Sequence, residues 1–118
     1  MNAEAVREYC RRKPHATEDL PFGDGALAIR VGGKMFALII LDKDPPRVNL
    51  KCDPALALRL RQKYPALVIP GFHMNKRHWN TVVLDGSIPD EDLRGMIDHS
   101  YKMVLRSLSR RERSGAIE

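Results

Sequence analysis

The apolar run at residues 35–41 restricts the fold more than any other feature of the sequence. All seven residues are hydrophobic, so a strand formed by them would carry apolar side chains on both of its faces. Such a strand is typical of the interior of a sheet. Crossing a bilayer takes about 20 residues, and this run is far shorter. It therefore predicts a central β-strand, and we expect no association with a membrane.

A hairpin is predicted immediately before this run. Gly32-Gly33 separates it from residues 27–31, in which Leu, Ile and Val alternate with Ala and Arg. Both central residues of a tight primed turn need positive φ, which glycine adopts without steric cost. Further strands are predicted at 18–22, 47–51, 67–70 and 79–84.

Three helices are predicted, at 3–12, from 54 to about 64, and from 89 to about 109. Asp53 and Pro54 start the second helix, because aspartate caps a helix N-terminus and proline suits its first position. In the last helix an apolar stripe faces the core, while Asp98 and His99 are predicted on the solvated side. The tail from residue 111 is predicted to fray.

The predicted order is helix, four strands, helix, two strands, helix, with no repeating β-α-β unit. Strands that are linked by hairpins and flanked by helices indicate the α+β class. We therefore predict a single domain over residues 1–118, with an antiparallel sheet of about five to six strands and helices beside it.

The two cysteines, Cys10 and Cys52, both lie beside apolar residues. Two cysteines are too few for the disulfide framework of a small secreted protein. The N-terminal residues Met-Asn-Ala-Glu-Ala do not form a secretory signal. We therefore predict two reduced, half-buried thiols and a cytoplasmic protein.

The cysteines and histidines do not form a motif of known chemistry. The chain has no Gly-x-Ser-x-Gly and no Cys-x-x-Cys, and neither cysteine has a histidine nearby in the sequence. The spacing of His73 and His78 fits neither a helical ligand pair nor a zinc finger. The glycines at 23 and 25 mark a turn rather than a phosphate-binding loop. We therefore predict no catalytic residue, metal or cofactor, and a binding protein rather than an enzyme.

Positive charge is concentrated in the middle of the chain. The net charge is +5, and residues 51–80 alone carry six basic residues against one acid. Within them, residues 71–81 combine two aromatics, two histidines, two asparagines and two bases. Basic side chains beside aromatic rings can hold phosphates and stack on bases, so DNA or another nucleic acid is the first partner we expect. The residues predicted to bind it are Lys51, Arg59, Lys63, Lys76, Arg77, His78 and Trp79, with Phe72 as an alternative stacking residue.

Three other interpretations stay open. Trp79 can anchor the core at the start of a strand, while the bases beside it are simply solvated. A small-molecule pocket can be lined by His73, Asn75, His78 and Asn80. The sheet can also dock a partner protein through an apolar patch, as an adaptor or chaperone does. In each case we expect the protein to be a monomer.

Four segments resemble the MmcQ/YjbR family of bacterial proteins. They are His-Met-Asn-Lys-Arg-His-Trp-Asn-Thr-Val at 73–82, Leu-Asp-Gly-Ser-Ile-Pro at 84–89, Ser-Tyr at 100–101, and Pro-His-Ala-Thr-Glu-Asp-Leu-Pro-Phe-Gly at 14–23. The resemblance covers essentially the whole chain. It implies a compact α+β fold similar to frataxin-type proteins or secretion chaperones, with helices on an antiparallel sheet. Members of the family are often labelled DNA-binding, and the resemblance supplies no catalytic residues.

Overall fold

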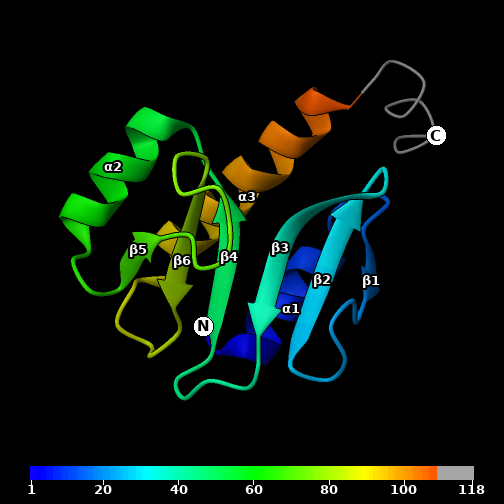
Figure 1. Cartoon of the computed structure of the whole chain (residues 1–118), viewed down its shortest axis with the longest axis horizontal. Coiled ribbons are helices and arrows are strands. Elements are labelled where there is room, and N and C mark those ends of the chain that lie inside the picture. The colour runs from blue at the N-terminus through cyan, green and yellow to red at the C-terminus, as the bar shows by residue number, and fades with distance from the viewer. Residues whose placement is uncertain (109–118) are drawn as a thin grey trace.

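The computed structural model describes residues 1–108 of the chain. Its helices and strands follow the predicted order, which confirms the α+β class (Figure 1). The elements are α1 (Ala3–Arg11), β1 (Thr17–Asp19), β2 (Ala26–Val31), β3 (Lys34–Ile40), β4 (Arg47–Lys51), α2 (Pro54–Lys63), β5 (Val68–Pro70), β6 (Trp79–Val83) and α3 (Asp90–Ser107). The predicted fraying from residue 111 lies outside the described residues.

The six strands form one antiparallel sheet in the order β1-β2-β3-β4-β6-β5. Strand β3 lies in the interior of the sheet and residues 36–39 are all buried, as the apolar run predicted. The β2–β3 turn has φ of 58° at Gly32 and 80° at Gly33, which confirms the predicted hairpin. A Cβ at Gly32 would also lie 2.6 Å from a methyl carbon of Leu108, so the Leu108 side chain would have to shift.

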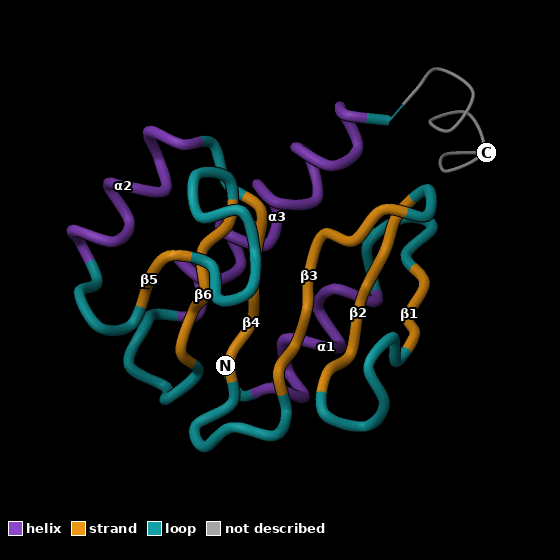
Figure 2. The backbone as a smooth tube through the Cα atoms, in the orientation of Figure 1, coloured by secondary structure: helices purple, strands orange, loops and turns teal. Residues whose placement is uncertain are grey.

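Helices α1 and α3 cover one face of the sheet, and α2 packs beside the edge strand β5 (Figure 2). Within the core, Phe36 packs edge to face against Tyr101 with ring centroids 5.2 Å apart. The largest fully buried apolar side chains are Phe36, Ile29, Ile39, Leu93, Ile97, Val6, Val31, Val48, Val68, Val82 and Val104. None of the described helices combines the length and the apolar character that crossing a membrane requires.

Ser100 links α3 to the two central strands. Its Oγ donates to the Phe36 carbonyl on β3 at 2.6 Å and accepts the Lys51 N–H from β4 at 2.8 Å. The side chain is fully buried, so the hydroxyl satisfies two backbone groups that water does not reach. This contact fixes the position of α3 above the sheet near the end of β4.

The prediction that Asp98 and His99 lie on a solvated side of α3 is wrong. Tyr9 and Lys13 both donate to Asp98 Oδ1, and His99 Nε2 accepts the N–H of Asp53 at 3.1 Å. Both residues are only partly exposed. Because α3 has α1 on one flank and α2 on the other, polar residues on its flanks contact neighbouring elements as well as water.

Strand β1 is shorter than the predicted segment 18–22. It pairs with β2 only over Thr17–Asp19. Pro21 has no N–H to donate to a ladder, and it forms only an isolated bridge with Gly23. Leu20 and Phe22 are consequently left exposed, with 49% and 75% of their surface accessible.

The face of the sheet opposite α1 and α3 is only partly covered. The loop between β5 and β6, residues 71–78, crosses in front of β4 and β6 (Figures 1 and 2). Beside this loop lies a hollow of about 450 Å³, which we name the open-face hollow. Its lining includes Leu38 and Ile40 of β3, together with the exposed rings of Phe22 and Phe72.

Candidate functional site

The loop 71–78, which the sequence singled out, is bound to the sheet at its first turn. Asn49 and Thr81 face each other on β4 and β6, and both are fully buried. Thr81 Oγ1 donates to Asn49 Oδ1 at 2.6 Å and accepts the Phe72 N–H at 2.9 Å, while Asn49 Nδ2 donates to the Phe72 carbonyl at 3.2 Å. Gly71 permits this close approach, since a Cβ there would lie 2.7 Å from the Cβ of Trp79.

The far half of the loop is held by α2. Arg61 Nε donates to Asn80 Oδ1 at 2.8 Å, and its Nη2 donates to the carbonyls of Lys76 and Trp79. Asn80 is 2% exposed and donates in turn to the Ala57 carbonyl at 3.4 Å. Nothing in the sequence distinguishes Arg61 from a solvated surface base, but the guanidinium of Arg61 holds the loop in place.

Three elements bring basic side chains together where β4 ends, β6 begins and α3 ends, at the top of Figure 1. An open hollow of about 470 Å³ lies there, lined by Lys51, Asn75, His78, Trp79, Met103, Arg106 and Ser107. Exposed bases surround it on the loop and on α3. We name the hollow, with the exposed residues Lys76, Arg77 and Lys102, the cationic end.

Charge is distributed unequally between the two ends of the strands. In residues 50–53, 71–79 and 99–108, which build the cationic end, Asp53 is the only acid. Its carboxylate is used to cap α2, because it accepts the N–H groups of Ala55 and Leu56. At the other end of the strands, residues 41–46 and 84–92 carry six acids and one base. This polarity favours the approach of an anion to the cationic end.

Five of the residues predicted to bind nucleic acid lie at the cationic end. Lys51, His78 and Trp79 line the hollow together. Lys76 and Arg77 are exposed on the adjoining part of the loop. Trp79 is partly exposed. Its backbone pairs with β4 in the sheet, while the residue also lines the hollow.

The other two predicted residues, Arg59 and Lys63, are placed differently. Arg59 is exposed on α2, whereas Lys63 reaches Asp92 of α3 at 3.4 Å and therefore lies on the flank of α2 that faces α3. The predicted residues thus do not form one continuous track. Instead, α3 contributes Lys102 and Arg106, two bases that the prediction missed. Their i, i+4 spacing near the end of the last helix is the sequence signal that could have identified them.

The four residues predicted to line a small-molecule pocket are separated by the loop. Asn75 and His78 line the cationic hollow. His73 lines the open-face hollow, with its ring centroid 4.0 Å from that of Phe72. Asn80 is buried and bonded to α2. The structure therefore does not bring these four side chains into one pocket.

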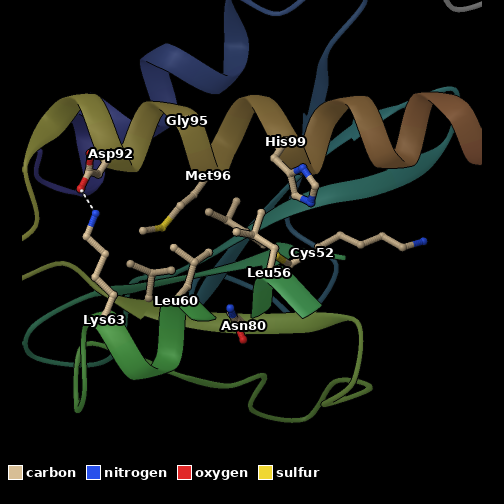
Figure 3. Close-up of a pocket in the computed structure, with 12 residues that line it drawn as sticks. Cys52, Leu56, Leu60, Lys63, Asn80, Asp92, Gly95, Met96 and His99 are labelled. Carbon is tan, nitrogen blue, oxygen red and sulfur yellow. Dashed lines mark hydrogen bonds and ion pairs between the residues drawn. The ribbon is translucent and has the colours of Figure 1, made fainter. Parts of the chain in front are cut away.

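Cys52 and His99 line the same cleft, between α2 and α3 (Figure 3). Burial and the nearby Asp53 raise the pKa of Cys52 to about 11, so the thiol stays protonated at neutral pH. Burial lowers the pKa of His99, whose Nε2 already accepts a backbone N–H. The pair therefore lacks the thiolate and imidazolium that a nucleophilic cysteine needs. Across residues 1–108 no group of three or more His, Cys, Asp or Glu is arranged to hold a metal ion.

Solved structures with the same fold extend over almost the whole chain. The crystal structure of Deinococcus radiodurans protein DR2400 superposes with a TM-score of 0.89 and 38% identity, covering 98% of this chain and 87% of that one. A crystal structure of a Pseudomonas syringae protein gives a TM-score of 0.75 and 27% identity, covering 88% of this chain and 99% of that one.

Sequence comparison identifies the family. Uncharacterized protein YjbR of Escherichia coli strain K12 is 36% identical over 113 residues, covering 96% of this chain and 95% of that protein. Uncharacterized protein YbdF of Escherichia coli O157:H7 is 38% identical over 116 residues, covering 95% of this chain and 94% of that protein. Neither relative is named for an activity or a ligand. A model of the YjbR family matches residues 11–103, and the chain therefore belongs to the YjbR family.

Proposed function

We propose that this protein binds nucleic acid through its cationic end and has no catalytic activity of its own. The observation that carries the proposal is the convergence of Lys51, His78, Trp79 and Arg106 on one open hollow. Contacts between basic side chains and phosphates supply most of the non-specific affinity for DNA or RNA. An indole at the edge of such a hollow can stack on an unpaired base.

The geometry favours binding with little sequence preference. The hollow offers bases, one aromatic ring and the amide of Asn75, whereas reading a sequence needs several side chains aimed at base edges. The six acids at the opposite end of the strands repel a polyanion, so the molecule approaches it with the cationic end in front. We propose that it acts as a cytoplasmic monomer, and the two free cysteines, both buried, fit that compartment.

Trp79 is the only tryptophan of the chain, and it lines the hollow, so the protein carries its own reporter. We would titrate the full chain with single- and double-stranded oligonucleotides at three salt concentrations and follow tryptophan fluorescence. We expect a saturable change whose affinity falls steeply with salt. Removing one phosphate contact, with Lys51→Gln or Arg77→Gln, should reduce the slope of log affinity against log salt by about 0.7–0.9.

Lys43→Gln is the matched control for these variants. It removes the same charge from an exposed lysine in the β3–β4 turn, at the opposite end of β4. We expect it to leave both the affinity and the salt slope unchanged. The proposal fails if neither oligonucleotide changes the fluorescence or the electrophoretic mobility at low salt. It also fails if Lys43→Gln weakens binding as much as Lys51→Gln, because the effect would then come from net charge alone.

A second candidate function, docking of another protein, is supported by the open-face hollow. Phe22 and Phe72 line it with 75% and 48% of their surface exposed, and contiguous exposed apolar surface of this kind marks interaction sites. The partner expected there is an apolar segment of another protein. Phe22→Glu should abolish capture of a partner, whereas Leu58→Glu, at an apolar position on α2 that is 56% exposed, should not. Capture that survives Phe22→Glu would exclude this surface.

A further inference from the structure

The cleft between α2 and α3 is a third concave site, which shares only Lys51 with the hollow of the cationic end. It encloses about 230 Å³. Figure 3 shows Leu56 and Leu60 pointing into it from α2, and Met96 pointing into it from α3. Its apolar lining consists of Leu50, Leu56, Leu60, Val82 and Met96. Leu56 and Leu60 stay partly exposed although they lie on the inward side of α2, so the cleft holds apolar surface that the protein itself does not cover.

The two ends of the cleft carry different polar groups. At one end Lys63 reaches Asp92 at 3.4 Å (Figure 3), so the two charges compensate each other. The hydroxyl of Tyr64 also donates to Asp92. Figure 3 shows His99 and Cys52 at the other end. Lys51, the residue before Cys52, also lines the cleft. Because His99 Nε2 accepts the backbone N–H of Asp53, the proton of the neutral ring is on Nδ1 and can be donated. This end therefore offers a cation and a hydrogen-bond donor.

Gly95 adds a second, independent observation. It lies inside α3, one turn from Asp92 and from His99, and it lines the cleft. Glycine is among the poorest helix formers, yet a Cβ at this position would meet no atom within 4 Å, and its φ is not in the left-handed region. Neither crowding within the chain nor backbone conformation accounts for glycine here. A molecule that lies in the cleft against the backbone of α3 would account for it.

We propose that this cleft binds a small apolar carboxylate. Its aromatic or branched aliphatic body lies between Leu56, Leu60 and Met96, and its carboxylate points toward Lys51 and His99. The volume of about 230 Å³ is below the roughly 300–1,000 Å³ of pockets for drug-sized ligands, so the ligand is a single ring or a short branched chain. The proposal does not depend on nucleic-acid binding.

The test uses 3-phenylpropanoate as the probe and the full chain labelled with ¹⁵N. We expect saturable shifts of backbone amide signals confined to the cleft, at Cys52, Gly95, Met96 and neighbouring residues. The uncharged analogue 3-phenylpropanamide should bind at least about tenfold more weakly, because it forms no charge-assisted hydrogen bond. Lys51→Gln should reduce the affinity for the acid. Lys43→Gln, which removes the same charge at an exposed position outside the cleft, should leave it unchanged.

The variant Gly95→Ala should change stability and ligand affinity in opposite directions, so a loss of binding cannot be explained by unfolding. Alanine is the better helix former and has open space at this position, so the melting temperature should rise by about 2–6 °C. The added methyl group should at the same time weaken binding of 3-phenylpropanoate severalfold. The proposal is overturned if the acid gives no saturable shifts, if the shifts map outside the cleft, or if the amide binds equally well. It is also overturned if Gly95→Ala binds the acid like the unmodified protein.

Discussion

Thr81 Oγ1 on β6 lies 2.6 Å from Asn49 Oδ1 on β4, and these two side chains bind both backbone groups of Phe72. The residues are directly opposed in the sheet and fully buried. A buried polar group that loses its partner destabilises a protein more than the bond had stabilised it. The pair therefore fixes where the loop 71–78 leaves the sheet, and with it the position of the cationic end.

Thr81→Val should lower the free energy of unfolding by about 1–3 kcal/mol, because it leaves Asn49 Oδ1 and the Phe72 N–H unpaired at nearly constant volume. Urea unfolding measures this loss, and hydrogen exchange at the Phe72 amide should accelerate. Thr81→Ser keeps the hydroxyl and should be closer to the unmodified protein in both measurements. Equal stability of the valine and serine variants would show that the hydroxyl does not hold the loop.

Arg61→Met should loosen the loop without unfolding the protein. The guanidinium binds Asn80, the Lys76 carbonyl of the loop and the Trp79 carbonyl at the start of β6, so we expect a loss of about 1–2 kcal/mol in urea unfolding. If Arg61 is an anchor and not a phosphate ligand, affinity for oligonucleotides should fall while the salt slope stays the same. Arg59→Met, at an exposed position of the same helix, should change stability by less than about 0.5 kcal/mol. A reduced salt slope for Arg61→Met would contradict the anchoring role.

Local patterns were enough to predict the elements of this fold. The apolar run at 35–41 became the interior strand β3, and Gly32-Gly33 became the turn before it. Asp53 caps α2 through its side chain, as aspartate before Pro54 predicted. These features depend on residues a few positions apart, where steric and hydrogen-bonding preferences act directly.

The site could be predicted only in part, because side-chain partners lie far apart in the sequence. Tyr9 and Asp98 are 89 positions apart, and nothing in the helical periodicity around Asp98 indicates a partner on α1. Arg61 has the same local signature as a solvated base, although it binds the loop. The cleft between α2 and α3 arises from the distance between two helices, and periodicity gives no information about that distance.

Asp98 should contribute to stability in a pH-dependent way. Burial opposes its ionisation, but hydrogen bonds from Lys13 and Tyr9 outweigh burial and hold the pKa of Asp98 below its ordinary value. An acid whose pKa is lower in the folded state stabilises the fold above its unfolded pKa, about 3.9, and loses this contribution as pH falls through the folded value. Asp98→Asn should therefore be less stable at pH 7, with a shallower loss of stability on acidification.

The expected difference for Asp98→Asn is less than about 1 kcal/mol, since its side chain is 37% exposed. Urea unfolding at a series of pH values from 7 to about 2 would measure it. Asp24→Asn, at an exposed position between β1 and β2, should give a curve parallel to that of the unmodified protein. An Asp98→Asn curve parallel to the unmodified one would contradict the prediction.

The two thiols should react slowly in the folded protein and differ from each other. Burial raises the pKa of Cys10 to about 12 and that of Cys52 to about 11, whereas an unperturbed cysteine has a pKa of about 8.5. Iodoacetamide at pH 8 should therefore modify the native protein far more slowly than the denatured protein, because the thiolate is the reactive form. Cys52 should react before Cys10, since it is 4% exposed and lines the cleft while Cys10 is fully buried.

The variants Cys10→Ser and Cys52→Ser show which of the two rates of iodoacetamide modification belongs to which thiol. Saturating 3-phenylpropanoate should slow the modification of Cys52 and leave that of Cys10 unchanged, because only Cys52 lines the cleft between α2 and α3. Equal slowing of both thiols would mean that the acid stabilises the whole fold without covering Cys52. Rapid native modification of Cys52 would instead show that its thiol is ionised near neutral pH, and that the cleft holds a reactive cysteine.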